Sequence, residues 1–122
     1  MTGTDTMALW LGAAFYGAVG GAAFVRPRTL LASFGIRAEG IDAANEIRAV
    51  YGGFPLALAG MLAWATQGGP LADGVVVAVA ISGLGMAGGR IVSAMIDRSL
   101  GRAPALFLGL EVIVSVVLLT AI

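Results

Sequence analysis

The side chains that could carry chemistry lie in three short stretches of an otherwise apolar chain. These stretches read NEIRAVYGGFP, GRIVSAMIDR and LGLEVIV, and each belongs to a long hydrophobic run. Their amide, carboxylate, guanidinium and hydroxyl groups include those of Asn45, Glu46, Arg48, Arg90, Ser93, Asp97 and Glu111. Because the chain has no His and no Cys, proton transfer would have to use carboxylates, tyrosines or a bound molecule. The usual zinc sites and histidine-ligated haem are excluded for the same reason.

Two kinds of chemistry suit these residue types. Carboxylates can act as acid and base in isomerisation, hydration or epoxide opening, and the candidates are Glu46, Glu111 and Asp97. Arginine offers paired donors to an anionic or oxygen-rich head group, which suggests a binding site. The candidate ligand-binding residues are Asn45, Arg48, Tyr51, Arg90, Ser93 and Tyr16. Magnesium is disfavoured because arginines lie beside the carboxylates, so we expect neither a metal nor a cofactor.

The composition indicates whether these residues lie in water or in a membrane. Of 122 residues, 59% are hydrophobic and 11% are charged, and the mean hydropathy is +0.97. These values are typical of an integral membrane protein. The seven arginines are balanced by seven acidic residues, so no basic excess suggests nucleic acid as a partner.

The lengths of the apolar segments predict an all-α four-helix bundle that spans a membrane. A bilayer core of about 30 Å requires roughly 20 helical residues. Four segments have that length, at residues 7–25, 44–66, 72–96 and 104–122. They use most of the chain, so residues 1–122 are predicted to form a single transmembrane domain. A cleaved signal peptide is the alternative for the first segment, but MTGTDT carries Asp5 and no basic residue.

The arginines between the segments predict the orientation. The first and third loops hold Arg26, Arg28, Arg37, Arg98 and Arg102, whereas the second loop and both ends hold no basic residue. Because short basic loops remain cytoplasmic, both termini are predicted to be non-cytoplasmic, in a bacterial inner membrane. Within the first loop, RPRTLLASFGI predicts a short interfacial helix that starts at Pro27 and ends near Gly35. An irregular loop anchored by apolar residues is the alternative.

This orientation places the polar groups in the cytoplasmic half of the membrane. Arg90 and Glu111 are expected at similar depth, and Met86, Arg90, Ser93 and Asp97 share one helical face. A charge at the centre of a span costs about 2.5–3.5 kcal/mol, so unpaired charges are unfavourable. We expect Arg48 and Arg90 to pair with carboxylates drawn from Glu46, Glu111 and Asp97. The alternative is that such pairs only fasten helices together.

Small residues predict the contact faces between helices. In lipid, small side chains let helix backbones approach closely. Stripes with a spacing of four contain Ala13, Gly17 and Gly21, then Ala49, Gly53 and Ala57, then Gly85 and Gly89. These stripes are expected to form contacts inside one bundle or between copies of the chain, so a homo-oligomer is one expectation.

NEIRAVYGGFPLALAG, followed by GRIVSAMIDR and by the glutamate of the last segment, resembles a bacterial family of small four-span membrane proteins. This family is known as domain of unknown function 4345, and the resemblance covers nearly the whole chain. It implies the four-span architecture but no activity. The family's polar and glycine positions would correspond to Asn45, Glu46, Arg48, Tyr51, Gly52, Gly53, Gly89, Arg90, Ser93, Asp97 and Glu111. A looser similarity to DoxX-like membrane proteins rests on size and span count alone.

Three classes of function are compatible with these residues. The first is a charged intramembrane pocket that binds, and in one version transforms, a lipophilic molecule or lipid. The second is a small proton-coupled transporter, although the first span has no central carboxylate and the halves show no inverted repeat. The third is an accessory or structural membrane subunit whose charged cluster only holds helices together.

Overall fold

The computed structural model describes residues 2–122, and the regular structure within them is entirely helical. The elements are α1 (Gly3–Val25), α2 (Pro27–Ala32), α3 (Gly40–Ile47), η1 (Arg48–Gly53), α4 (Phe54–Ala65), α5 (Ala72–Asp97) and α6 (Arg102–Leu119). Four helical segments are long and apolar enough to cross a membrane, namely Gly3–Val25, Gly40–Ala65, Ala72–Asp97 and Arg102–Leu119. The predicted all-α class and the four spans are therefore confirmed, with boundaries shifted by up to four residues.

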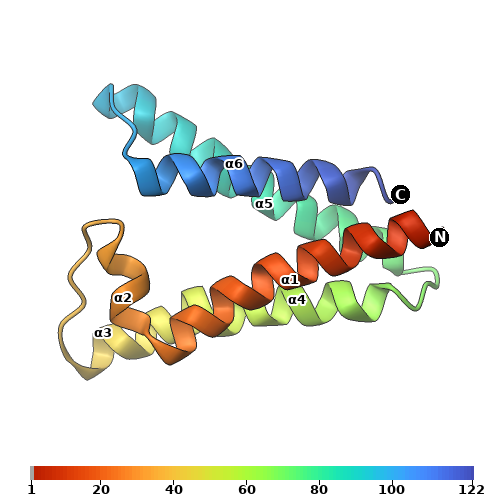
Figure 1. The fold of residues 1–122 in the computed structure, drawn as a ribbon, viewed down its shortest axis with the longest axis horizontal. Coiled ribbons are helices and arrows are strands. Elements are labelled where there is room, and N and C mark those ends of the chain that lie inside the picture. Colours follow the sequence, from red (N-terminus) through yellow and green to blue (C-terminus); the bar gives the residue numbers. More distant parts are fainter. Residues whose placement is uncertain (1) are drawn as a thin grey trace.

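The spans are arranged as two helical hairpins. α1 packs along η1 and α4, and α5 packs along α6. Figure 1 shows that the hairpins meet at the end that holds both termini and diverge at the end that holds α2. The main core lies at the end where the hairpins meet, and there Leu9, Leu62, Val76 and Leu118 are fully buried. The opposite end, where the hairpins diverge, carries the arginine-containing loops. This open end has space for a site between the hairpins.

The short helix predicted after the first span is present as α2. Pro27 occupies its first turn, where a missing N–H costs nothing, and Gly35 follows it with φ +74°. The N–H of Ile36 donates to the carbonyl of Leu31, which closes the helix in the manner of a Schellman motif. Leu31 anchors α2 in a second apolar cluster with Ala23 and Ile47.

The second span is interrupted by one wide turn. η1 is a π-helix, and Phe54 N–H donates to the carbonyl of Ala49, five residues earlier. Pro55 explains this geometry, because its ring would clash with the carbonyl of Tyr51 in a regular α-helix and it has no N–H to donate. The wide turn changes which residues of this span face the bundle, and here Gly52 is buried while Ala49 is exposed.

The small-residue stripes form contacts inside the bundle only in part. In α1, Ala13 is buried and an added Cβ at Gly17 would lie 3.8 Å from the Cβ of Ala59, but the closest contacts are made by Gly12 and Gly20, and a Cβ at Gly21 would meet nothing within 4 Å. In α5 the buried glycine is Gly83, and Gly85 and Gly89 are exposed. In a membrane the outward face is as apolar as the inward one, so hydrophobic periodicity does not separate the two faces.

Candidate ligand-binding site

A part-buried ion pair joins α5 to α6 in the half of the bundle where the two hairpins diverge, which we call the open half. The Nε of Arg90 donates to Oε2 of Glu111, and its Nη2 donates to Oε1, both at 2.9 Å. The Glu111 side chain is 3% exposed and the Arg90 side chain is 25% exposed. This two-point geometry is the strongest form of arginine–carboxylate recognition. Of the three carboxylates that the sequence left open as partners of Arg90, the structure pairs it with Glu111.

The short turn between α5 and α6 explains why Arg90 and Glu111 meet. α5 ends at Asp97 and α6 begins at Arg102, so the two helices run antiparallel from a short turn. Arg90 lies seven residues before the end of α5, and Glu111 lies nine residues after the start of α6. At about 1.5 Å per residue, both therefore lie roughly 10–14 Å from the turn. An isolated charge at that depth would be costly, and the pair neutralises both.

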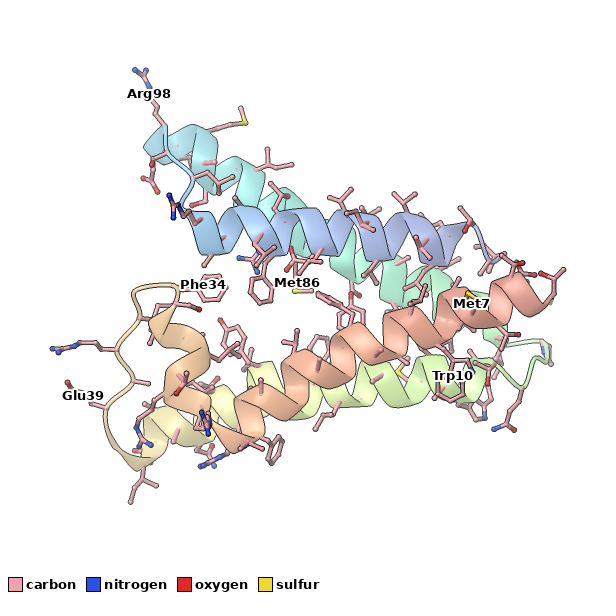
Figure 2. All side chains as sticks on the ribbon, in the orientation of Figure 1. Met7, Trp10, Phe34, Glu39, Met86 and Arg98 are labelled. Carbon is pink, nitrogen blue, oxygen red and sulfur yellow. The ribbon has the colours of Figure 1, made fainter. Side chains whose placement is uncertain are left out.

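Two neighbouring aromatic rings contact the guanidinium of Arg90. Its Cζ lies 5.6 Å from the ring centroid of Phe34 and 5.7 Å from that of Phe107, within the range of a cation–π contact. The two rings are themselves 5.2 Å apart. Phe34 follows α2, and Figure 2 shows it with Met86 between the two hairpins. The short helix thus brings an aromatic side chain from the first loop onto the ion pair.

A cavity of about 250 Å³ adjoins the pair. Its polar lining groups are the side chains of Tyr16, Tyr51, Arg90 and Glu111. The remaining wall is apolar or aromatic and consists of Phe15, Val19, Leu30, Leu31, Phe34, Val50, Phe54, Pro55, Leu58, Met86 and Phe107. All four membrane-length segments and α2 contribute to it, so the cavity lies between the hairpins. Its volume is slightly below the roughly 300–1,000 Å³ of typical small-molecule pockets.

Two buried hydroxyls near this cavity have no hydrogen-bond partner among the described residues. They are Oη of Tyr16 and Oγ of Ser115, in side chains that are 2% and 0% exposed. Both lie against Gly83 of α5, where an added Cβ would meet each of them. A buried donor without an acceptor is costly, particularly where no bulk water is near. The two hydroxyls therefore mark a polar position at the interface of α1, α5 and α6.

The structure does not bring the NEIR stretch into this site. Asn45, Glu46 and Arg48 are exposed and do not line the cavity. Arg48 donates through Nε to the carbonyl of Phe24 at 3.2 Å, and within residues 2–122 it forms no ion pair. The expected pairing of Arg48 with a carboxylate is therefore wrong in the part of the chain that the structure describes. Its contact instead satisfies a carbonyl at the end of α1.

The other candidate residues divide between the cavity and its surroundings. Tyr16 and Tyr51 line the cavity. Ser93 lies outside it, in a surface groove that Tyr51 and Arg90 also line. Asp97 is exposed at the end of α5 and lines neither space. Four of the candidate residues therefore line the cavity, with contributions from both hairpins. They are Tyr16, Tyr51, Arg90 and Glu111.

Sequence reasoning missed Phe34, Phe107 and Ser115. A lone phenylalanine in an apolar chain carries no signal for a site, and only the packing of α2 brings Phe34 to Arg90. Ser115 could have been found, because it lies four residues after Glu111 and so shares its helical face.

Residues 5–122 match the family described as Domain of unknown function (DUF4345). The chain belongs to this family. No curated protein matches it, and no solved structure matches it. The looser similarity to DoxX-like proteins is not shown by these comparisons. Family and fold together make the chain a small integral membrane protein.

Proposed function

We propose that this DUF4345 protein binds a lipophilic molecule through an oxygen-bearing polar end, in the cavity between its two hairpins. The observation that carries the proposal is the part-buried Arg90–Glu111 pair in the wall of a mostly apolar cavity of about 250 Å³. Ligand sites of proteins combine the same features, namely a mostly apolar wall and a few convergent polar groups. A longer ligand would leave its apolar tail in the membrane, because the cavity alone is small.

The exposure of Arg90 supports a binding role over a purely structural one. A guanidinium has five N–H donors, and two of them donate to Glu111. Because a quarter of the side chain is exposed, donors remain for a ligand oxygen. Glu111, by contrast, is almost completely covered and serves to hold Arg90 in place.

Of the three carboxylates proposed for acid/base catalysis, Glu111 alone lines the cavity. Glu46 and Asp97 lie outside the cavity, so neither can exchange a proton with a molecule bound there. Both oxygens of Glu111 already accept from Arg90. The arrangement therefore favours binding over acid/base chemistry with two carboxylates.

The first test identifies what the protein carries when it is purified. Small molecules that co-purify in mild detergent are extracted and measured by mass spectrometry. We expect a lipophilic species that is enriched in the native protein and depleted about tenfold in the double variant Arg90→Met, Glu111→Leu. Removing the two charges together leaves no unpaired charge in the bundle, so the double variant should remain folded. Depletion of the co-purified species then reports lost binding and not unfolding.

The matched control for this test is Arg102→Met, which removes an exposed arginine at the start of α6. It should retain the co-purified species at the native level. Equal enrichment in all three proteins would contradict the proposal and favour an accessory or structural role for the ion pair.

We further propose that the open end of the bundle faces the cytoplasm of a bacterial cell and that both termini lie on the opposite side. The support is the positive-inside rule together with the fold. All five loop arginines lie in the two connections at the open end, Arg26 to Gly40 and Arg98 to Arg102. The α4–α5 connection and the termini lie at the other end (Figure 1).

The orientation can be tested by labelling, because the chain contains no cysteine. A Gln67→Cys variant places a thiol in the α4–α5 connection, and a Ser99→Cys variant places one in the α5–α6 connection. In right-side-out vesicles, a membrane-impermeant maleimide should label the thiol at position 67 and spare the thiol at position 99. Inside-out vesicles should give the reverse pattern, and the same labelling of both thiols would contradict the four-span topology.

A further inference from the structure

We infer that the polar end of the ligand is neutral and accepts hydrogen bonds without donating them, as a ketone or other carbonyl group does. This inference rests on the proposed function and specifies the chemical class that the same cavity would take. Three features of the site carry it, namely its charge balance, its inventory of donors and its two buried hydroxyls.

The charge balance favours a neutral ligand. Arg90 is the one cation among the cavity residues, and Glu111 is the one anion. The bidentate contact between them leaves the site with no net charge. An anionic head group would add an uncompensated negative charge beside a buried carboxylate in a medium of low dielectric. A neutral polar group adds none.

The inventory of hydrogen-bonding groups in the ion pair favours an acceptor, and the hydroxyls of Tyr16 and Tyr51, which can donate or accept, are compatible with one. Arg90 retains three N–H groups beyond the two that bind Glu111, and arginine has no acceptor. The strongest acceptor at the site is the Glu111 carboxylate, but it is 3% exposed and both of its oxygens are already bound. The reachable part of the ion pair therefore consists of donors, which match a carbonyl oxygen better than an alcohol or an amide N–H.

The buried hydroxyl of Tyr16 supplies a further donor. Its ring lines the cavity, and its Oη lies beside Ser115 at the position of Gly83 without an acceptor among the described residues. The side chain comes from α1, in the opposite hairpin from Arg90. The hydroxyl itself is covered, so a ligand oxygen can accept from it only when the Tyr16 side chain turns toward the cavity that its ring lines, and this contact would satisfy a group that the protein itself leaves without a partner.

The test compares probes that have the same chain length and different polar ends. The binding of 2-decanone, decanoate and decane to the protein in lipid nanodiscs is measured by calorimetry, with empty nanodiscs subtracted, at a pH where decanoate is ionised. We expect the ketone to bind roughly tenfold more tightly than decanoate or decane. Tighter binding of decanoate would overturn the inference and leave the proposed function standing. Binding of none of the probes would overturn both.

The Tyr16→Phe variant separates a binding role from a structural one. The hydroxyl has no partner in the protein, so its removal should leave the thermal unfolding temperature unchanged or slightly raised. Affinity for 2-decanone should fall roughly fivefold, while affinity for decane stays the same. The control is Ser82→Ala, which removes an exposed hydroxyl of α5 that donates to the carbonyl of Ala78. Unchanged ketone affinity in Tyr16→Phe would overturn the assignment of Tyr16 as a donor to the ligand.

Discussion

Replacing Glu111 by Leu is expected to lower the free energy of unfolding by about 3 kcal/mol, near the lower end of the range for breaking a buried ion pair. The variant removes the carboxylate that accepts from Arg90 at 2.9 Å through both of its oxygens. The arginine would then lie against two phenylalanine rings without a counter-charge. Its 25% exposure gives partial relief, which is why we expect the lower end. Unfolding by an anionic detergent, followed through the fluorescence of Trp10 and Trp64, measures the change.

The double variant Arg90→Met, Glu111→Leu tests whether the loss comes from the unpaired charge. A buried pair that is replaced by apolar residues of similar volume is often as stable as the original or more so. We therefore expect the double variant to recover most of the stability lost in Glu111→Leu. Together with the single variant Arg90→Met, which completes the double-mutant cycle, the two positions should show a coupling energy of at least about 2 kcal/mol.

The control for this cycle is Ile113→Leu, an apolar exchange at an exposed position of the same helix, which should change stability by less than about 0.5 kcal/mol. Native stability in Glu111→Leu would contradict the account, because it would mean that Arg90 finds another acceptor or reaches water. A stable double variant that has lost its ligand would separate the binding role of the pair from any role in folding.

The depth of the ion pair could be predicted because a membrane makes charge expensive. Arg90 and Glu111 lie deep in apolar runs, so each needed a partner, and the positive-inside rule placed both in the same half of the bilayer. No comparable constraint acts on Asn45, Glu46 and Arg48. They lie close enough to the end of their span to be exposed, and Arg48 finds a backbone carbonyl instead of a carboxylate.

The rotation of each helix about its own axis, which decides the face that packs inward, could not be predicted from the pattern of small residues. In α1, a spacing of four predicts a contact face with Ala13, Gly17 and Gly21. It disfavours the face of Gly12 and Gly20, because the large side chain of Tyr16 lies between these two glycines. The structure uses the face of Gly12 and Gly20, where Tyr16 fits into the interface against Gly83 of α5. Simple counting treats a large side chain as a break in a contact face, whereas here it fills space that a glycine on another helix leaves open.

Replacing Gly20 by Ala is expected to destabilise the protein by about 1–2 kcal/mol, although alanine favours helix formation more than glycine. The added Cβ would lie 2.8 Å from the carbonyl oxygen of Gly52 and 3.0 Å from the amide nitrogen of Leu56. Both are backbone atoms of the facing span, so relief requires α1 to move away from η1 and α4. Because that contact joins the two helices of one hairpin, the same variant should also disturb the cavity wall formed by Tyr16 and Leu58.

Two glycines that differ in their surroundings provide the graded comparison for this prediction. Gly52→Ala would meet the ring of Phe24 at 2.6 Å, but this side chain is 47% exposed and can rotate away, so the loss should be smaller than at Gly20. Gly21→Ala has nothing within 4 Å and should be neutral or stabilising through helix propensity. We expect the order of stability Gly21→Ala, then Gly52→Ala, then Gly20→Ala in detergent unfolding. A Gly20→Ala protein as stable as the Gly21→Ala protein would contradict the close approach of α1 to η1, and the stripe at Gly17 and Gly21 would then be the contact face.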